Sequence, residues 1–171
     1  QGHELPNMLM WAAVSGIVCG VAGGLFSSFL YRGAAAFAPV RWRSFIRRHL
    51  LVVAFVMGIL LALLGTFYQG KTYGTGYHEA AAALKGAYEA PFGLAAAKWA
   101  ATVFSYWAGI PGGIFTPSLT IGAMIGEHMA SFAQLGDASN VAVLLCMAAF
   151  LAAATQSPLT AAVVVMEMTG G

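Results

Sequence analysis

The sequence predicts an all-α integral membrane protein with tilted and broken helices, and three observations support this fold class. First, 60% of the 171 residues are hydrophobic and 8% are charged, whereas a soluble domain carries about 25% charged residues. Second, residues 5–31, 50–70, 99–126 and 138–166 contain no Asp, Glu, Lys or Arg, and a membrane-spanning helix needs roughly 20 apolar residues. Third, glycines and prolines interrupt one of these runs. This composition excludes a soluble globular enzyme and a disordered chain.

The first apolar run predicts a tilted spanning helix over residues 7–32. Gly16, Gly20, Gly23 and Gly24 follow one another within it at short intervals. Small residues at such spacing let the backbone of a second helix approach closely. We therefore expect this helix to pack against a neighbour through its glycines.

The connection after the first helix is basic. Arg32 and the segment 41–49 hold five of the eight basic residues, and no acid accompanies them. Because loops rich in Arg and Lys stay on the cytoplasmic side, this connection is expected to be a cytoplasmic loop, and a site for anionic lipid is the alternative. The net charge of +2 does not indicate nucleic acid binding.

The middle of the sequence predicts three further helices. Residues 50–68 form a second span, residues 78–85 a short helix after a glycine-rich turn, and residues 90–106 a third apolar helix. Lys98 is the only charged residue of this last helix. A lysine inside a span marks a candidate site, and the alternative is a side chain near the helix end that extends to the membrane surface.

The helix breakers of the third uncharged run are the main functional signal. Gly109, Pro111, Gly112, Gly113 and Pro117 lie at the centre of this run, where they oppose helix formation. Irregular backbone at membrane depth is tolerated only where protein buries it or where it lines a cavity. The sequence therefore predicts a loop over 109–117 between two half-helices, the second at 114–129.

The chemistry of that loop follows from its backbone. A helix N-terminus has N–H groups without intrahelical partners and about half a positive charge, and glycines allow an ion to approach the main chain. Pro117 falls in the first turn, where its missing N–H costs little. The loop is thus a candidate anion site, and a kink that serves only packing is the alternative.

Several segments resemble the CLC family of chloride channels and chloride/proton antiporters. Gly112 to Pro117 resembles the Gly-x-Phe-x-Pro signature of that family, and residues 105–113 resemble its lead-in, although positions 106–108 depart from the commonest form. Residues 154–160 and 166–169 resemble its Ala-Pro-Leu-Thr to Glu-Met-Thr segment, and residues 74–77 and Lys98 have counterparts. The resemblance covers nearly the whole chain, as the second half of the family's membrane domain.

The resemblance implies a chloride site in the loop. The backbone amides of Ile114 and Phe115 would coordinate the anion, and Gly113 and Pro117 would shape the loop. The secondary candidates are Gly112, Thr116, Lys98 and Glu167. The gating glutamate and the serine motif of the family's first half have no match, so residues 1–171 are expected to be a C-terminal-half fragment that carries one wall of the pathway. The family also implies a homodimer.

The last part of the chain predicts two more helices. Residues 140–155 form an apolar helix, and residues 158–169 form one too short to span a membrane. Glu167 is interpreted either as a buried carboxylate in ion handling or as a structural group near a subunit contact. Cys19 and Cys146 lie in apolar runs, which favours packing over a disulfide.

The expected function is membrane transport of chloride or similar small anions, as part of a CLC-type voltage-gated channel or antiporter. The alternative is a non-conducting membrane scaffold or oligomerisation fragment. An enzyme is not expected, because no nucleophile–base set, paired carboxylates or metal-spaced histidines occur. The expected partners are chloride or another halide, the lipid bilayer, a second subunit and the missing first half. No cofactor or metal is expected, and the bacterial inner membrane is the expected location.

Overall fold

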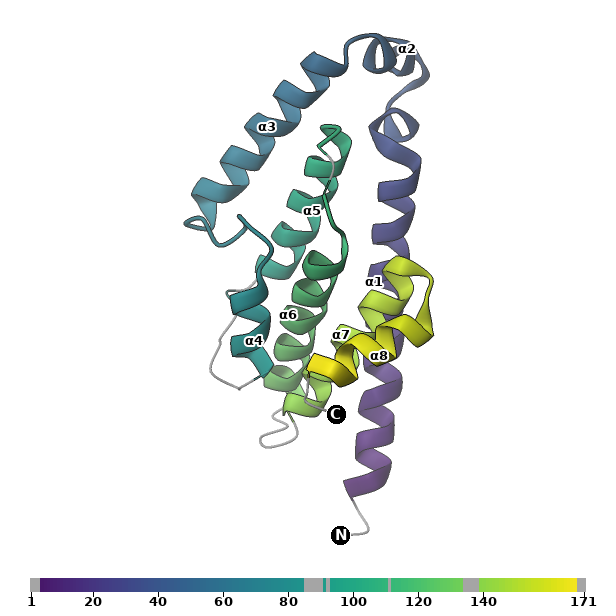
Figure 1. Ribbon diagram of the computed structural model, residues 1–171, viewed down its shortest axis with the longest axis vertical. Helices are drawn as coiled ribbons and strands as arrows, with labels where there is room; N and C mark the ends of the chain where they lie inside the picture. Colours follow the sequence, from purple (N-terminus) through teal and green to yellow (C-terminus); the bar gives the residue numbers. More distant parts are fainter. Residues whose placement is uncertain (1–3, 85–90, 92, 111, 134–138, 169–171) are drawn as a thin grey trace.

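The computed structural model describes residues 4–84, 91, 93–110, 112–133 and 139–168. Within this part of the chain, all regular structure is helical, which confirms the predicted fold class (Figure 1). The helices are α1 (Glu4–Phe37), α2 (Val40–Arg48), α3 (Leu50–Phe67), α4 (Tyr77–Leu84), α5 (Leu94–Trp107), α6 (Phe115–Ala133), α7 (Ser139–Thr155) and α8 (Pro158–Met168).

The helices form a packed group from which one hairpin-like arm extends. α1 runs along the length of the molecule, α5, α6 and α7 form one packed group, and α3 packs against α5 and is joined to α1 by α2 at one end (Figure 1). Met10–Phe37 and Leu50–Phe67 are long and apolar enough to cross a membrane, and α7 and α8 are apolar but shorter. Much of the apolar surface of α1 and α3 is exposed within this chain.

Two glycines allow α6 and α7 to pack in close contact. A Cβ atom placed on Gly122 would lie 2.8 Å from the carbonyl oxygen of Cys146, and one on Gly126 would lie 2.6 Å from the Cα of Val143. The glycines are four residues apart and so lie on the same face of α6. The backbone of α7 therefore rests directly on α6, as in membrane helix pairs that pack through small residues.

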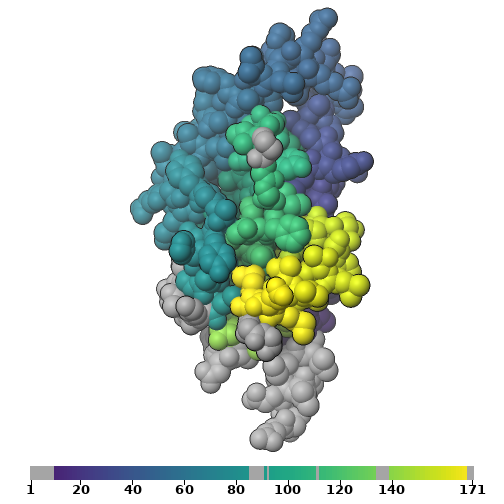
Figure 2. Space-filling model, in the orientation of Figure 1, coloured from purple at the N-terminus to yellow at the C-terminus, as the bar shows by residue number. Residues whose placement is uncertain are grey.

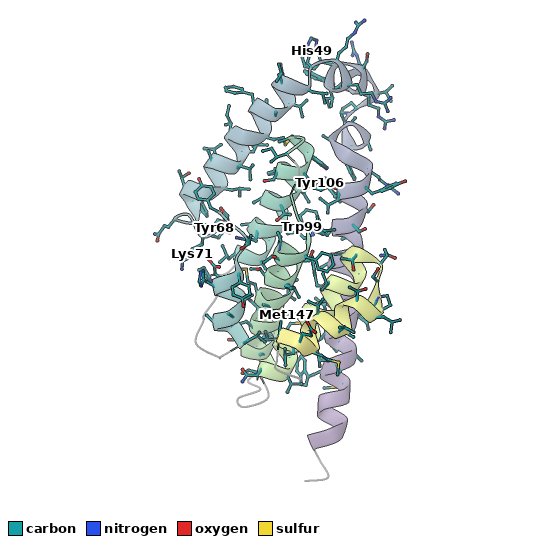
Figure 3. All side chains as sticks on the ribbon, in the orientation of Figure 1. His49, Tyr68, Lys71, Trp99, Tyr106 and Met147 are labelled. Atoms are coloured by element: carbon teal, nitrogen blue, oxygen red, sulfur yellow. The ribbon has the colours of Figure 1, made fainter. Side chains whose placement is uncertain are left out.

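Two apolar clusters fill the spaces around this helix pair. One joins α4, α6, α7 and α8 around Leu119, Met147 and Leu151. The other joins α1, α5, α6 and α7 around Phe26 and Phe150, whose ring centroids are 5.6 Å apart. Figure 3 shows Met147 among the packed helices, where it is fully buried.

The helix α1 is held to its neighbours by indole groups and by one glycine. The Nε1–H of Trp107 donates to the carbonyl of Phe29 at 2.9 Å. A Cβ on Gly23 would lie 2.8 Å from the carbonyl oxygen of Phe150, whereas Gly16, Gly20 and Gly24 face no atom within 4 Å. Among these glycines of α1, only Gly23 therefore brings the helix into close contact with α7. Gly33, with φ of 67°, interrupts regular helix near the end of α1.

Cys19 and Cys146 are both buried free thiols. They belong to the apolar cluster that joins α1 and α7. The Sγ–H of Cys146 contacts the Sδ of Met129 at 3.9 Å. The prediction that both side chains serve packing is therefore confirmed.

Three elements differ from the predicted ones. The first helix was predicted over residues 7–32 and extends over Glu4–Phe37. The basic connection was expected to be a loop, but residues 40–48 form the helix α2, which makes up one end of the molecule (Figure 2). Its arginines favour helix as well as solvent. The helix after the glycine–proline loop continues to Ala133 rather than ending at Met129. Pro111, Lys85 and the expected start of the third apolar helix lie outside the described residues.

The contact between α6 and α7 can be tested by adding one methyl group. Gly126→Ala in the complete protein should lower the free energy of unfolding by roughly 1–3 kcal/mol, because the methyl group overlaps the α7 backbone. Gly58→Ala in α3 is the matched control, since a Cβ there meets nothing within 4 Å and alanine favours helix. Thermal unfolding in detergent measures both variants, and equal midpoints would contradict the close packing.

Candidate functional site

The candidate site begins where the chain enters α6. α5 ends at Trp107 and α6 begins at Phe115, so the intervening described residues are not helical. The carbonyl of Ile114 accepts the first helical hydrogen bond, from the N–H of Ser118 at 3.0 Å, and also accepts the Ser118 hydroxyl at 2.6 Å. Pro117 is therefore the third residue of the helix, where its lack of an N–H leaves no acceptor unsatisfied.

Four backbone amides at this helix start have no acceptor within the described part of the chain. They are the N–H groups of Gly113, Ile114, Phe115 and Thr116. The helix behind them is 19 residues long, and its aligned peptide dipoles place about half a positive charge at this end. The arrangement provides several donors for a negatively charged ligand without a cationic side chain.

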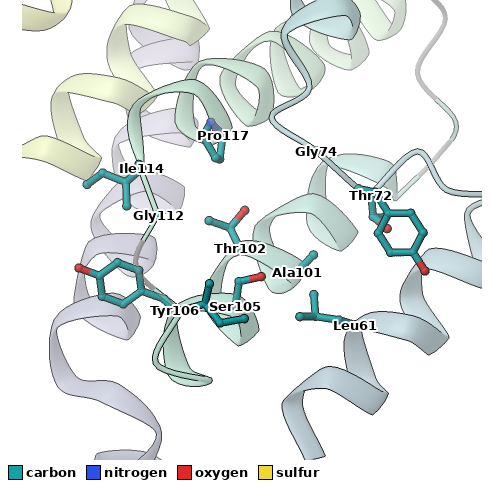
Figure 4. A pocket seen from close by; sticks show the side chains of 13 residues that line it. Leu61, Thr72, Gly74, Ala101, Thr102, Ser105, Tyr106, Gly112, Ile114 and Pro117 are labelled. Atoms are coloured by element: carbon teal, nitrogen blue, oxygen red, sulfur yellow. The ribbon is translucent and has the colours of Figure 1, made fainter. Parts of the chain in front are cut away.

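Two of these four residues, Gly113 and Ile114, line a cavity of about 290 Å³ (Figure 4). Four segments form its walls: the loop before α6, one face of α5, the turn before α4, and α3. The lining residues are Leu61, Thr72, Tyr73, Gly74, Ala101, Thr102, Ser105, Tyr106, Ile110, Gly112, Gly113, Ile114 and Pro117. None of them is acidic or basic, so hydroxyl and backbone groups supply the polarity of the cavity.

Lys98 holds the turn that forms the far wall. Its side chain is 1% exposed, and its Nζ donates to the carbonyl of Tyr73 at 3.0 Å and to that of Lys71 at 3.5 Å. The alternative of a lysine that extends to the membrane surface is therefore wrong. Without Lys98, the carbonyls of the turn would have no donor inside an apolar structure. A hydrogen bond between these carbonyls and the ammonium group is more favourable than burying either group without a partner.

Thr120 supports the same turn from α6. Its hydroxyl lies 3.1 Å from the carbonyl of Thr75 and 2.9 Å from that of Thr116. Gly74 and Gly76 have φ of 68° and 77°, a left-handed conformation that favours glycine. The turn is thus attached to α5 through Lys98 and to the first turns of α6 through Thr120.

The structure brings most of the sequence-predicted site residues together. Gly112, Gly113, Ile114 and Pro117 line the cavity. Phe115 follows them with 42% of its surface exposed, and the half-buried Thr116 comes next, its carbonyl oxygen bonded to Thr120. Lys98 does not line the cavity and lies behind the turn, bonded to its carbonyls.

Glu167 is not part of this cavity. It lies near the end of α8 with an exposed side chain. The interpretation of Glu167 as a buried carboxylate in ion handling requires a buried side chain, which Glu167 does not have within this chain.

Sequence reasoning missed the hydroxyl-bearing wall residues. Thr102 and Ser105 follow Lys98 at helical spacing, so a polar stripe on an otherwise apolar helix was the available signal. Thr72 is 6% exposed, and its hydroxyl has no partner among the described residues. No local pattern indicated Thr72, because its place beside α5 depends on the hydrogen bonds of Lys98.

Comparison with known proteins relates this chain to chloride channels and transporters. A family model described as voltage gated chloride channel matches residues 1–171. The chain is 29% identical over 174 residues to the H(+)/Cl(-) exchange transporter ClcA of Yersinia pestis bv. Antiqua (strain Angola) and, equally, to that of Yersinia pseudotuberculosis serotype O:3 (strain YPIII). In both cases 97% of this chain is covered and 36% of the relative.

A second kind of relative matches a shorter part. The chain is 41% identical over 80 residues to the voltage-gated ClC-type chloride channel ClcB of Yersinia pseudotuberculosis serotype O:1b (strain IP 31758), which covers 43% of this chain and 19% of that protein. No solved structure gives a significant match. The chain thus spans about a third of the length of the exchange transporters it matches. Because the family model covers the whole chain, this integral membrane protein belongs to the voltage-gated chloride channel family, the CLC family.

Proposed function

We propose that this chain forms one wall of a pathway for chloride or similar small anions, in a CLC-type channel or chloride/proton antiporter. The observation that carries the proposal is the start of α6, where four amides have no acceptor in the described structure. Two of them belong to Gly113 and Ile114, which line a cavity without an acidic lining residue. The relatives named as an H(+)/Cl(-) exchange transporter and as a chloride channel support it.

The amides suit an ion that must be both bound and released. Each N–H carries a partial charge, so several together replace part of the hydration shell of a halide without the strong attraction of an arginine. Conduction requires such moderate binding. We assign the direct contacts to the N–H groups of Ile114 and Phe115 and the shape of the loop to Gly113 and Pro117, with Gly112 and Thr116 as neighbours.

Lys98 makes an indirect contribution in this proposal. Its ammonium group occupies the carbonyls of Lys71 and Tyr73, whose partial negative charges would otherwise repel an anion near the cavity. The buried positive charge also favours an anion nearby. Lys98 is therefore a positioning residue rather than a ligand.

The remaining parts of the assembly follow from the same proposal. Residues 1–171 act as the second half of a CLC-type membrane domain, with 109–117 as the anion loop, and the residues that complete the pathway come from outside this chain. Chloride is the only ligand required, and the role is transport rather than catalysis. The bacterial relatives favour the inner membrane.

We also propose a homodimer, with the exposed face of α8 as a contact region. Leu159 and Val163 are 83% and 56% exposed there. Glu167 belongs to this region of the chain rather than to the anion pathway.

Anomalous diffraction from bromide tests the site directly. Crystals of the complete protein soaked in bromide should show a peak within hydrogen-bonding distance of the amide nitrogens of Ile114 and Phe115. A loop that is packed without an ion, together with no halide flux in liposomes, would instead favour the non-conducting scaffold. A site that takes Na⁺ through exposed carbonyls would also contradict the proposal.

Deleting one amide gives a sharper test. Phe115→Pro removes the N–H at the first helical position, where proline is tolerated, while Phe115→Ala removes the ring and keeps the N–H. A hydrogen bond to a charged group contributes about 1.5–3 kcal/mol, so chloride affinity should fall roughly 10- to 150-fold in the proline variant. Calorimetric titration with chloride should find the alanine variant close to wild type, and equal losses would exclude the amide as a ligand.

Replacing Lys98 tests its positioning role. Lys98→Met should lower the free energy of unfolding by roughly 1–3 kcal/mol, because the carbonyls of Lys71 and Tyr73 lose their buried donor. Lys98→Arg keeps donor and charge and should retain most of the stability. Thermal unfolding and chloride titration of both variants separate the two effects, and a methionine variant as stable as wild type would show that the hydrogen bonds do not hold the turn.

A further inference from the structure

The helix α2 is the part of the chain that the proposed pathway does not use. It joins two apolar helices, since α1 ends at Phe37 and α3 begins at Leu50. It has nine residues, none of them buried, and a length of about 14 Å at 1.5 Å per residue. His49 ends α2 and begins α3, and its carbonyl accepts the N–H of Val53 at 3.1 Å. Two spans joined so closely hold α2 at the membrane surface.

The side chains of α2 divide into two faces. At 3.6 residues per turn, Trp42, Phe45 and Ile46 share one side of the helix, while Arg47 and Arg48 lie opposite and other arginines flank them. Trp42 and Phe45 are 58% and 43% exposed, and their ring centroids are 5.8 Å apart. A basic amphipathic helix with exposed aromatic residues is typical of helices that lie in the membrane interface.

One arginine fixes α2 to the end of α1. The guanidinium of Arg43 donates to the carbonyl of Ala38 and to that of Ala36, at 3.2 Å each. The helix is therefore oriented by a specific contact. Its faces keep a defined direction relative to the spans.

The other arginines of α2 have no acidic neighbour. No Asp or Glu occurs in the sequence between Glu4 and Glu79, and no ion pair to α2 occurs among the described residues. Arg41, Arg47 and Arg48 are all exposed. Three uncompensated guanidinium groups thus lie beside an aromatic surface.

We propose that α2 is an interfacial binding site for anionic lipid headgroups. The lipid phosphates bind Arg41, Arg47 and Arg48. The apolar face, formed by Trp42, Phe45 and Ile46, inserts at the boundary between the headgroups and the acyl chains. Only a lipid surface offers both partners at once along a helix that two spans hold at the membrane. Guanidinium groups match phosphate geometry, and tryptophan is enriched at this depth. The proposal extends beyond the placement of basic residues on the cytoplasmic side, because it names a ligand and a binding geometry.

Native mass spectrometry of the delipidated complete protein tests the headgroup preference. Phosphatidylglycerol and phosphatidylcholine are titrated separately, and wild type should bind phosphatidylglycerol with the higher affinity. The triple variant Arg41→Gln/Arg47→Gln/Arg48→Gln should lose this preference, by about fivefold for each charge removed. Lys71→Gln, which removes an exposed cation outside α2, is the matched control and should keep it.

The depth of α2 is tested in nanodiscs that contain phosphatidylglycerol with brominated acyl chains. Quenching of tryptophan fluorescence should include a component that disappears in Trp42→Phe. The proposal is supported if the triple arginine variant loses the headgroup preference and Trp42 is quenched. An unchanged preference in that variant, no preference in wild type, or an unquenched Trp42 would each overturn it, and the last result would indicate an acidic protein partner instead. None of these outcomes depends on halide binding.

Discussion

The structure depends on one constraint: irregular backbone inside an apolar helical protein must have its polar groups paired or reserved for a ligand. The turn before α4 meets this constraint through Lys98, whose ammonium group binds the carbonyls of Lys71 and Tyr73, and through Thr120, which bonds the carbonyl of Thr75. The start of α6 meets it differently, because its first amides have no acceptor in the described structure. Both segments line the same cavity, the turn through Thr72, Tyr73 and Gly74 and the loop through Gly112, Gly113 and Ile114.

The packing of α6 against α7 makes this arrangement rigid. Gly122 and Gly126 bring the α7 backbone into direct contact with α6, and apolar clusters on both sides of the pair add α1, α5, α4 and α8. The first turn of α6 therefore starts from a helix that cannot shift easily. A site built from backbone amides needs such support, because the direction of an N–H group changes only with the whole helix.

The arm formed by α2 and α3 serves a different purpose from the packed group. α3 contributes Leu61 to the cavity wall, and its Gly65 faces the ring of Tyr73 with no room for a methyl group. α2 lies at the end of this arm with its arginines exposed (Figure 1). The same helix hairpin thus carries the exposed arginines of α2 at one end and a residue of the cavity wall in α3.

The sequence by itself determined the helical class, the apolar helices and the interruption before α6, because hydropathy and the effects of glycine and proline act locally. It also indicated the loop residues Gly112 to Pro117, since their donors belong to the backbone. Local reasoning left two interpretations open for Lys98, because its partners lie more than 20 residues earlier. It was wrong for residues 40–48, where a run of arginines obscured an amphipathic helix. Only the tertiary structure decided that Thr72, Thr102 and Ser105 meet the loop around one cavity. Such proximity arises from the packing of distant segments, which no local pattern of residues encodes.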